Sequence, residues 1–158
     1  MIDDVTLARA LHVLFVVHWI GGVGFVTLVV LPLAKSRPNA EEALALLTGV
    51  ERRFAAQVRI TMPLAGATGL WMTWRMELWD RFLDPHFWWM GAMLGLWLFF
   101  MLMLFVLEPL LHARFEERAR RDPPPALRKM ITLHAVLFAF AALTILGAVA
   151  GAHGLVFF

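Results

Sequence analysis

Six histidines lie in or at the ends of apolar stretches, and the imidazole is the side chain of this sequence best suited to chemistry in a membrane. In chain order they are His12, His18, His86, His112, His134 and His153. Ionisable residues inside a membrane are costly and are therefore candidates for function. A b-type haem held by two imidazoles needs them at one depth on different helices, with a slot between them for the macrocycle.

The depth of each histidine decides which pairs could hold such a haem. His12 and His153 lie toward the outer ends of the first and last apolar stretches, and we predict that they bind the iron of one haem b. His18 lies about 9 Å deeper than His12 at 1.5 Å per residue and could replace either ligand in tilted helices. His112 and His134 could form an inner pair, so we expect one haem or two. For each ring the alternative, a place among the lipid headgroups, stays open.

Arginines at the two rims could pair with haem propionates. Arg75 is the outer candidate. The inner candidates are Arg52, Arg53 and Arg59, of which Arg59 is favoured because it lies about a turn inside the helix. Snorkelling to the interface is the alternative for all of them. Glu108 lies one helical turn before His112, so the two could form a hydrogen-bonded relay or an inner site with His134.

Glycines lie on all four apolar stretches, and histidines flank the same zone. Small-xxx-small motifs ordinarily indicate close helix packing or dimerisation. Missing side chains could also leave room for a flat cofactor, and both interpretations stay open. The glycines in question are Gly21, Gly22, Gly24, Gly66, Gly69, Gly91, Gly95, Gly147 and Gly151.

Other metal chemistry has less support. The chain has no cysteine, which excludes thiolate metal sites, disulfides and covalently attached haem. Thioethers bind Cu(I), and Met90 and Met93 share a helix face. Methionine is also a common apolar filler, so copper is the less favoured cofactor.

The elements that must position these residues are four apolar stretches, near residues 7–31, 54–74, 87–111 and 130–152. Apolar residues make up 61% of the chain and charged residues 16%, against about 25% charged in a soluble domain. Each stretch is longer than the roughly 20 residues that a spanning helix needs. We therefore predict one all-α domain over 1–158, an integral membrane four-helix bundle in contact with the lipid bilayer.

The basic residues predict the sidedness of this bundle. All but three of the 14 lysines and arginines fall in or beside the first and third loops. Short basic loops stay in the cytoplasm, so both termini are expected on the outer, periplasmic side of a bacterial inner membrane. The same layout explains the basic pI without nucleic-acid binding. The first stretch lacks a basic leader and is expected to be retained as a helix.

Local signals add detail. Asn39 is expected to cap a separate amphipathic surface helix, and Pro63 to kink the second spanning helix. The three prolines at 123–125 predict a polyproline segment in the third loop. Five tryptophans predict an interfacial belt at the outer side, namely Trp71, Trp74, Trp79, Trp88 and Trp89.

Two segments resemble known membrane families. The first stretch contains His12 and continues His18-Trp-Ile-Gly-Gly, and the second is entered by Glu51-Arg52-Arg53-Phe54 and carries Pro63 and Gly69. This resembles the HemJ-type membrane protoporphyrinogen oxidase family and the membrane domain of the copper-resistance protein D (CopD) family. The resemblance covers about half of the chain closely. It implies haem binding at His12 and matches His112 loosely to a histidine late in the third helix.

The leading hypothesis is a b-type haem membrane redox protein that transfers electrons or serves as the haem-bearing subunit of a membrane complex. Alternatives are a HemJ-like protoporphyrinogen oxidase, a CopD-like copper transport or tolerance protein, and a cofactor-free structural subunit. Whether the chain is an oxidoreductase enzyme is left open. We expect it to form a homo-oligomer or to join a larger membrane complex.

Overall fold

The computed structural model describes residues 3–155, apart from the side chains at positions 112, 115 and 120. Within these residues every regular element is a helix, which confirms the all-α prediction. The elements are α1 (Asp4–Phe25), a π-helical turn η1 (Val26–Val30), α2 (Leu31–Lys35), α3 (Ala40–Arg75), short 3₁₀ turns η2 (Trp79–Phe82) and η3 (Pro85–Phe87), α4 (Trp88–Leu102), a second π-helical turn η4 (Met103–Leu107), α5 (Glu108–Arg121) and α6 (Pro123–Ala152).

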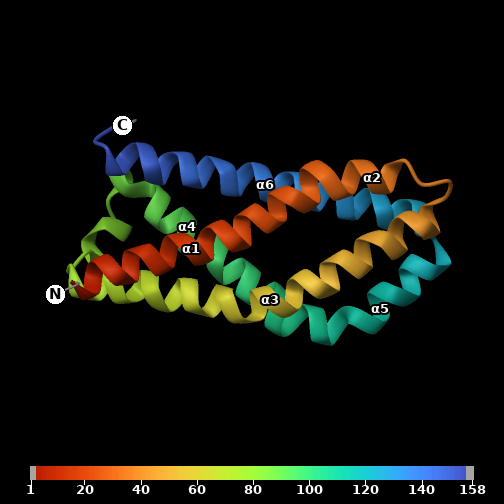
Figure 1. Ribbon diagram of the computed structural model, residues 1–158, viewed down its shortest axis with the longest axis horizontal. Coiled ribbons are helices and arrows are strands. Elements are labelled where there is room, and N and C mark those ends of the chain that lie inside the picture. The colour runs from red at the N-terminus through yellow and green to blue at the C-terminus, as the bar shows by residue number, and fades with distance from the viewer. Residues whose placement is uncertain (1–2, 156–158) are drawn as a thin grey trace.

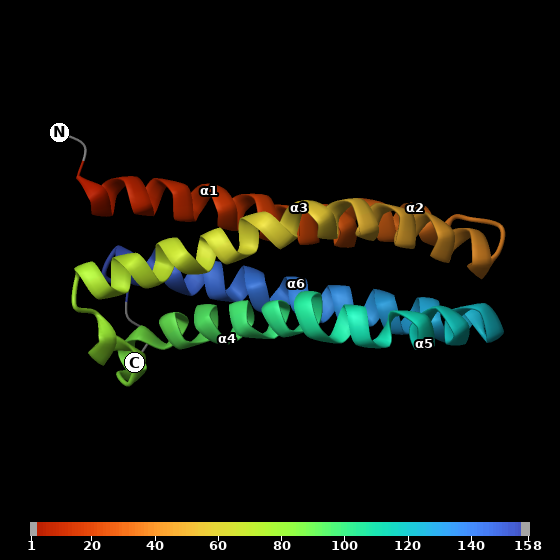
Figure 2. The ribbon, with the colours of Figure 1, turned by 90° about the horizontal axis from the view of Figure 1, so that it is seen from below.

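These elements join into long helical segments that lie side by side (Figures 1 and 2). α1, η1 and α2 form one continuous segment, and α4, η4 and α5 form another. Figure 1 shows the first and last described residues at the same end of the bundle, with the α2–α3 and α5–α6 connections at the opposite end. Both connections therefore face the same side, as the basic loops require.

Among the described residues, three segments are long and apolar enough to cross a membrane: Asp4–Lys35, Pro85–Leu111 and Pro123–Ala152. α3 is the longest helix at 36 residues, but Gln57, Arg59 and Thr61 make its middle more polar. The structure thus supports a membrane protein with several spanning helices, while a fourth crossing by α3 and the side of the termini stay predictions.

Buried apolar residues form two clusters along the bundle. One joins α1 to α3, α4 and α6 at mid-length, through Trp19, Val58, Met62, Leu96 and Ala141 among others. The second lies at the end that carries the basic connections and joins η1 and α2 to α3 and α6. Many large apolar side chains face outward, as expected of helices in contact with lipid.

Several helix ends differ from the sequence prediction. The Asn39 cap is confirmed, because the Glu42 N–H donates to Asn39 Oδ1 over 2.8 Å. The surface helix is not separate, however, and α3 continues from Ala40 through Pro63 to Arg75. The polyproline prediction is wrong, since Pro123 begins α6. Prolines suit a first helical turn, whose N–H groups lack intrahelical acceptors.

The space expected beside several glycines is filled by indole rings. A Cβ at Gly66 would clash with Trp97, one at Gly147 with Trp88, and one at Gly151 with Trp89. These glycines thus mark close packing and not room for a cofactor. Gly91 and Gly95 are exposed and would meet nothing.

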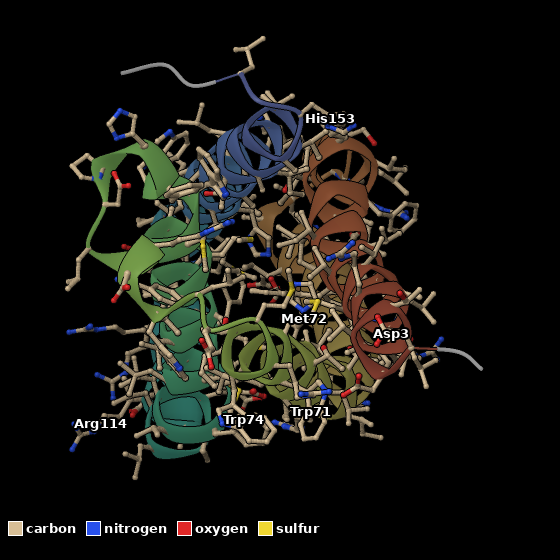
Figure 3. All side chains as sticks on the ribbon, turned by 90° about the vertical axis from the view of Figure 1, so that its left-hand side faces the viewer. Asp3, Trp71, Met72, Trp74, Arg114 and His153 are labelled. Carbon is tan, nitrogen blue, oxygen red and sulfur yellow. The ribbon has the colours of Figure 1, made fainter. Side chains whose placement is uncertain are left out.

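The tryptophan belt is smaller than predicted. Trp71, Trp74 and Trp79 are exposed, and Figure 3 shows Trp71 and Trp74 on the outside of α3 with Met72 turned toward the middle of the bundle. Trp89 is buried, and Trp88 packs on α6, so these two rings hold helices together.

Candidate functional site

His12 of α1 is turned toward α3 and is fixed by that helix. Its Nδ1 lies 2.8 Å from the carbonyl oxygen of Ala65 and 3.3 Å from Oγ1 of Thr68. Gly69 makes room for the ring, since a Cβ there would lie 3.1 Å from His12 Cε1. The Ala65 carbonyl can only accept, so Nδ1 carries the proton, and a neutral ring then presents the lone pair of Nε2. Metal-ligating histidines have this arrangement.

His18, six residues further along the same helix, has both ring nitrogens engaged. Nδ1 lies 3.1 Å from Thr61 Oγ1, and Nε2 lies 3.2 Å from Gln57 Oε1, both on α3. Such polar pairs join helices in apolar surroundings. Of the two candidates on the first helix, His12 is therefore the one with an uncommitted nitrogen.

His153 lies just after α6 and is exposed (Figure 3). Its Nδ1 is 2.8 Å from the carbonyl oxygen of Val149, so its Nε2 is also free of a described partner. The pairing of His12 with His153 across one haem stays a prediction. His86 lies toward the end of the bundle that carries both termini, called the outer end from here on, and its Nδ1 is 2.8 Å from Asp84 Oδ1.

Arg75 is engaged at the outer rim. Its Nε and Nη2 donate to the two carboxylate oxygens of Asp4, over 2.7 Å and 3.3 Å. This pair joins the first residue of α1 to the last residue of α3 and neutralises the charge that was expected to meet a propionate.

A cavity of about 1330 Å³ occupies the half of the bundle that carries the α2–α3 and α5–α6 connections, called the inner half from here on. α3 and the η4–α5 segment form most of its wall, and α1, η1, α4 and α6 contribute the rest. Its charged and titratable lining includes Glu51, Arg52, Arg59, Glu108, Lys129 and His134. Ligand pockets for drug-sized molecules are roughly 300–1,000 Å³, so this one is large enough for a bulky membrane-soluble molecule.

The inner titratable residues pair differently from the prediction. Arg59 Nη2 lies 2.9 Å from Glu108 Oε2, across the cavity from α3 to α5. His134 Nε2 lies 3.2 Å from Glu51 Oε1, so the partners of Glu108 and His134 both come from α3. The side chain of His112 lies outside those described, so the expected relay from Glu108 to His112 stays a prediction, and the described partner of Glu108 is Arg59.

The Glu51–His134 pair joins α3 to α6. His134 Nδ1 is 2.9 Å from the Met130 carbonyl oxygen, which can only accept, so Nδ1 is protonated. Nε2 is the ring nitrogen that faces the Glu51 carboxyl group. Sequence reasoning missed Glu51. It directly precedes Arg52 and Arg53, which were interpreted only as basic residues that keep the first loop in the cytoplasm.

Trp19 is the second residue that sequence reasoning missed. It is 4% exposed and lines the cavity, and its Nε1 has no hydrogen-bond partner among the described residues. In the sequence, Trp19 was noted only as part of the His18-Trp-Ile-Gly-Gly motif. Nothing in the sequence separates an unpartnered indole N–H from a satisfied one.

The described residues contain no group of three or more histidine, cysteine or acidic side chains able to hold a metal ion. Comparison of the chain with protein-family models, curated proteins and solved structures gave no match. The motifs in the first two helices are thus the sole support for the HemJ-type and CopD-type resemblances, and the function has to be argued from the geometry.

Proposed function

We propose that this chain is a b-type haem protein of a bacterial inner membrane, crossing it four times with both termini outside, and that it transfers electrons alone or within a larger complex. The observation that carries the proposal is His12. It is the histidine inside the bundle whose Nδ1–H is held by a carbonyl, at Ala65, while its Nε2 has no described partner.

The residues fit the ligand chemistry of haem. The Ala65 carbonyl and Thr68 hydroxyl orient the His12 ring and make its Nε2 a better donor to iron. His153 repeats the arrangement with the Val149 carbonyl, and it is the proposed second ligand. A bound haem would supply one-electron redox chemistry at its iron, and the surrounding groups would tune its potential.

A second candidate function, a cofactor-free structural subunit, is favoured by the filled glycine surfaces. Trp88 and Trp89 pack onto Gly147 and Gly151, and Trp97 packs onto Gly66, as in close helix–helix packing. The HemJ-like and CopD-like alternatives rest on the motif resemblance alone.

An absorption spectrum of the protein, produced in haem-replete cells and purified in detergent, separates the two candidates. A Soret band with a sharp α-band on reduction supports the haem protein. Colourless protein of native fold, which also takes up no added haemin, supports the structural subunit.

Variants of the two histidines on α1 then locate the ligand. His12→Ala should lose haem or give a high-spin spectrum. His18→Ala, the matched control, should keep the low-spin spectrum, because both nitrogens of His18 are already bonded to α3. The reverse result would contradict the assignment to His12.

A further inference from the structure

Three exposed, charged side chains of the cavity wall have no partner among the described residues. They are Glu41 and Arg52 of α3 and Lys129 of α6. The other ionisable groups of the wall are engaged, namely Arg59 with Glu108, Glu51 with His134, and Glu116. A ligand can therefore use two cations and one carboxylate of this wall without breaking an ion pair of the fold.

These three groups are ordered along the bundle. α3 and α6 both begin at the end that carries the two connections, the inner end, and the 3.2 Å contact between Glu51 and His134 fixes their relative level (Figure 1). Lys129 precedes His134 by five residues and Glu41 precedes Glu51 by ten, so they lie about 8 Å and about 15 Å nearer the inner end. Arg52 directly follows Glu51. The carboxylate is thus outermost, and the two cations come next.

Beyond the cations the cavity wall is mainly apolar. α3 lines it as far as Met62, about 15 Å past Arg52, and Phe100 of α4 lines the same part. About 15 Å is half the hydrocarbon thickness of a bilayer, the depth of one leaflet. Arg59 and Glu108 line the cavity and yet are 43% and 35% exposed, so the cavity is open between α3 and α5. An acyl chain can enter there from the bilayer.

This order of groups selects among the lipids of a membrane. An acyl chain suits the apolar part, a phosphate suits the two cations, and an ammonium group beyond the phosphate suits the outermost carboxylate. A fatty acid or phosphatidylglycerol has no cation to place at Glu41. Phosphatidylcholine has a cation without an N–H, whereas the ammonium of phosphatidylethanolamine has three donors, as that of lysine does.

We propose that the inner cavity binds one molecule of phosphatidylethanolamine, with its phosphate between Arg52 and Lys129, its ammonium group at Glu41 and an acyl chain in the apolar part. Basic pockets between membrane helices are a general setting for phospholipid headgroups. The proposal requires that α3 lies in the bilayer. It concerns a site separate from His12 and does not depend on a haem.

Native mass spectrometry of the full chain tests the proposal, with phosphatidylethanolamine, phosphatidylglycerol or phosphatidylcholine added in turn to the protein in detergent. We expect one phosphatidylethanolamine per chain, bound about fivefold more tightly than the other two lipids. The double variant Arg52→Gln, Lys129→Gln should weaken this binding about tenfold, because it removes both partners of the phosphate.

The matched control is the double variant Arg53→Gln, Arg128→Gln. It removes the same charge from the adjacent positions at the same end of the bundle, but neither residue belongs to the described wall of the cavity, and Arg53 lines a separate pocket. Phosphatidylethanolamine affinity should stay within about twofold of the wild type. Circular dichroism checks the fold of each variant.

Ala55→Phe separates binding in the cavity from adsorption at the surface. Ala55 lies between Arg52 and Arg59 on the face of α3 that lines the cavity, so the added ring occupies the path of the acyl chain and leaves the charged groups in place. Affinity should fall at least about tenfold. Equal affinity for the three lipids, an equal loss in both double variants, or full affinity in Ala55→Phe would each overturn the proposal. Tighter binding of phosphatidylglycerol would overturn it in favour of an anionic lipid.

Discussion

Arg59 of α3 and Glu108 of α5 form an ion pair across the inner cavity, with 2.9 Å between Nη2 and Oε2. The apolar cluster at mid-length includes residues of α4 but none of α5, so this pair is a tie between α3 and α5 in the inner half. An ion pair with limited access to water is screened less than one on a soluble surface. Because both residues line the cavity, loss of the pair should change the stability of the inner half and the shape of the cavity together.

The first prediction concerns this pair. Glu108→Gln and Arg59→Met should each destabilise the protein, and the double variant should recover part of the loss, with a coupling energy on the order of 1 kcal/mol. Thermal unfolding in detergent measures it. The Glu117–Arg121 pair on α5, whose side chains are more exposed, is the control and should show almost no coupling. Equal coupling in the two pairs would contradict a special role for Arg59.

The second prediction concerns topology. Reporter fusions after Lys35 and Asp122 should be cytoplasmic, and a fusion at the C-terminus should be external. The reason is that the basic connections lie at the end of the bundle opposite to both termini. A cytoplasmic C-terminus would reverse the sidedness, and a C-terminus opposite to the N-terminus would mean that α3 does not cross.

The packing was harder to predict than the helices. Apolar length and the Asn39 cap were enough to predict helices and one helix start, because these depend on local sequence. The role of a glycine depends on what lies opposite. Gly151 and Gly95 have the same motif, yet Trp89 covers the first and nothing meets the second. That difference arises from helix rotation, which the sequence pattern does not specify.

In the candidate site, too, the positions of the histidines could be predicted from the sequence, but their partners could not. Histidine positions predicted where polar chemistry is concentrated, and His12 and His134 do contact other helices. Their partners were not predicted, because Ala65 contributes a backbone carbonyl and Glu51 lies 83 residues before His134 along the chain. A contact of either kind has no signature in residue type or spacing.

The third prediction concerns pH and the outer connection. The backbone N–H and the ring of His86 hold the pKa of Asp84 below its usual range. A carboxyl group with a lowered pKa stabilises the fold above its unfolded pKa of about 3.9, and that contribution is lost as the pH falls through the folded value. Asp84→Ala should therefore lower the melting temperature at about pH 7 and have a smaller effect at about pH 3. Asp80→Ala, in the same connection, is the control. An Asp84→Ala effect that does not change with pH would contradict the linkage.

The last prediction is that His153 is the second axial ligand of the outer haem. Its Nδ1 is held by the Val149 carbonyl at 2.8 Å, which leaves Nε2 available. The indole of Trp89 covers Gly151 but does not cover His153, since two residues rotate the side chain by about 200° around a helix. His153→Ala should convert a low-spin spectrum to a high-spin one, and because the position is exposed, added imidazole should restore the low-spin form. His86→Ala is the matched control, because His86 is also an exposed histidine at this end of the bundle but lies in the turn η3 before α4 and not at the end of α6, and it should leave the spectrum unchanged. A low-spin spectrum that survives in His153→Ala and is lost in His134→Ala would move the haem to the inner cavity, and would contradict the outer pair.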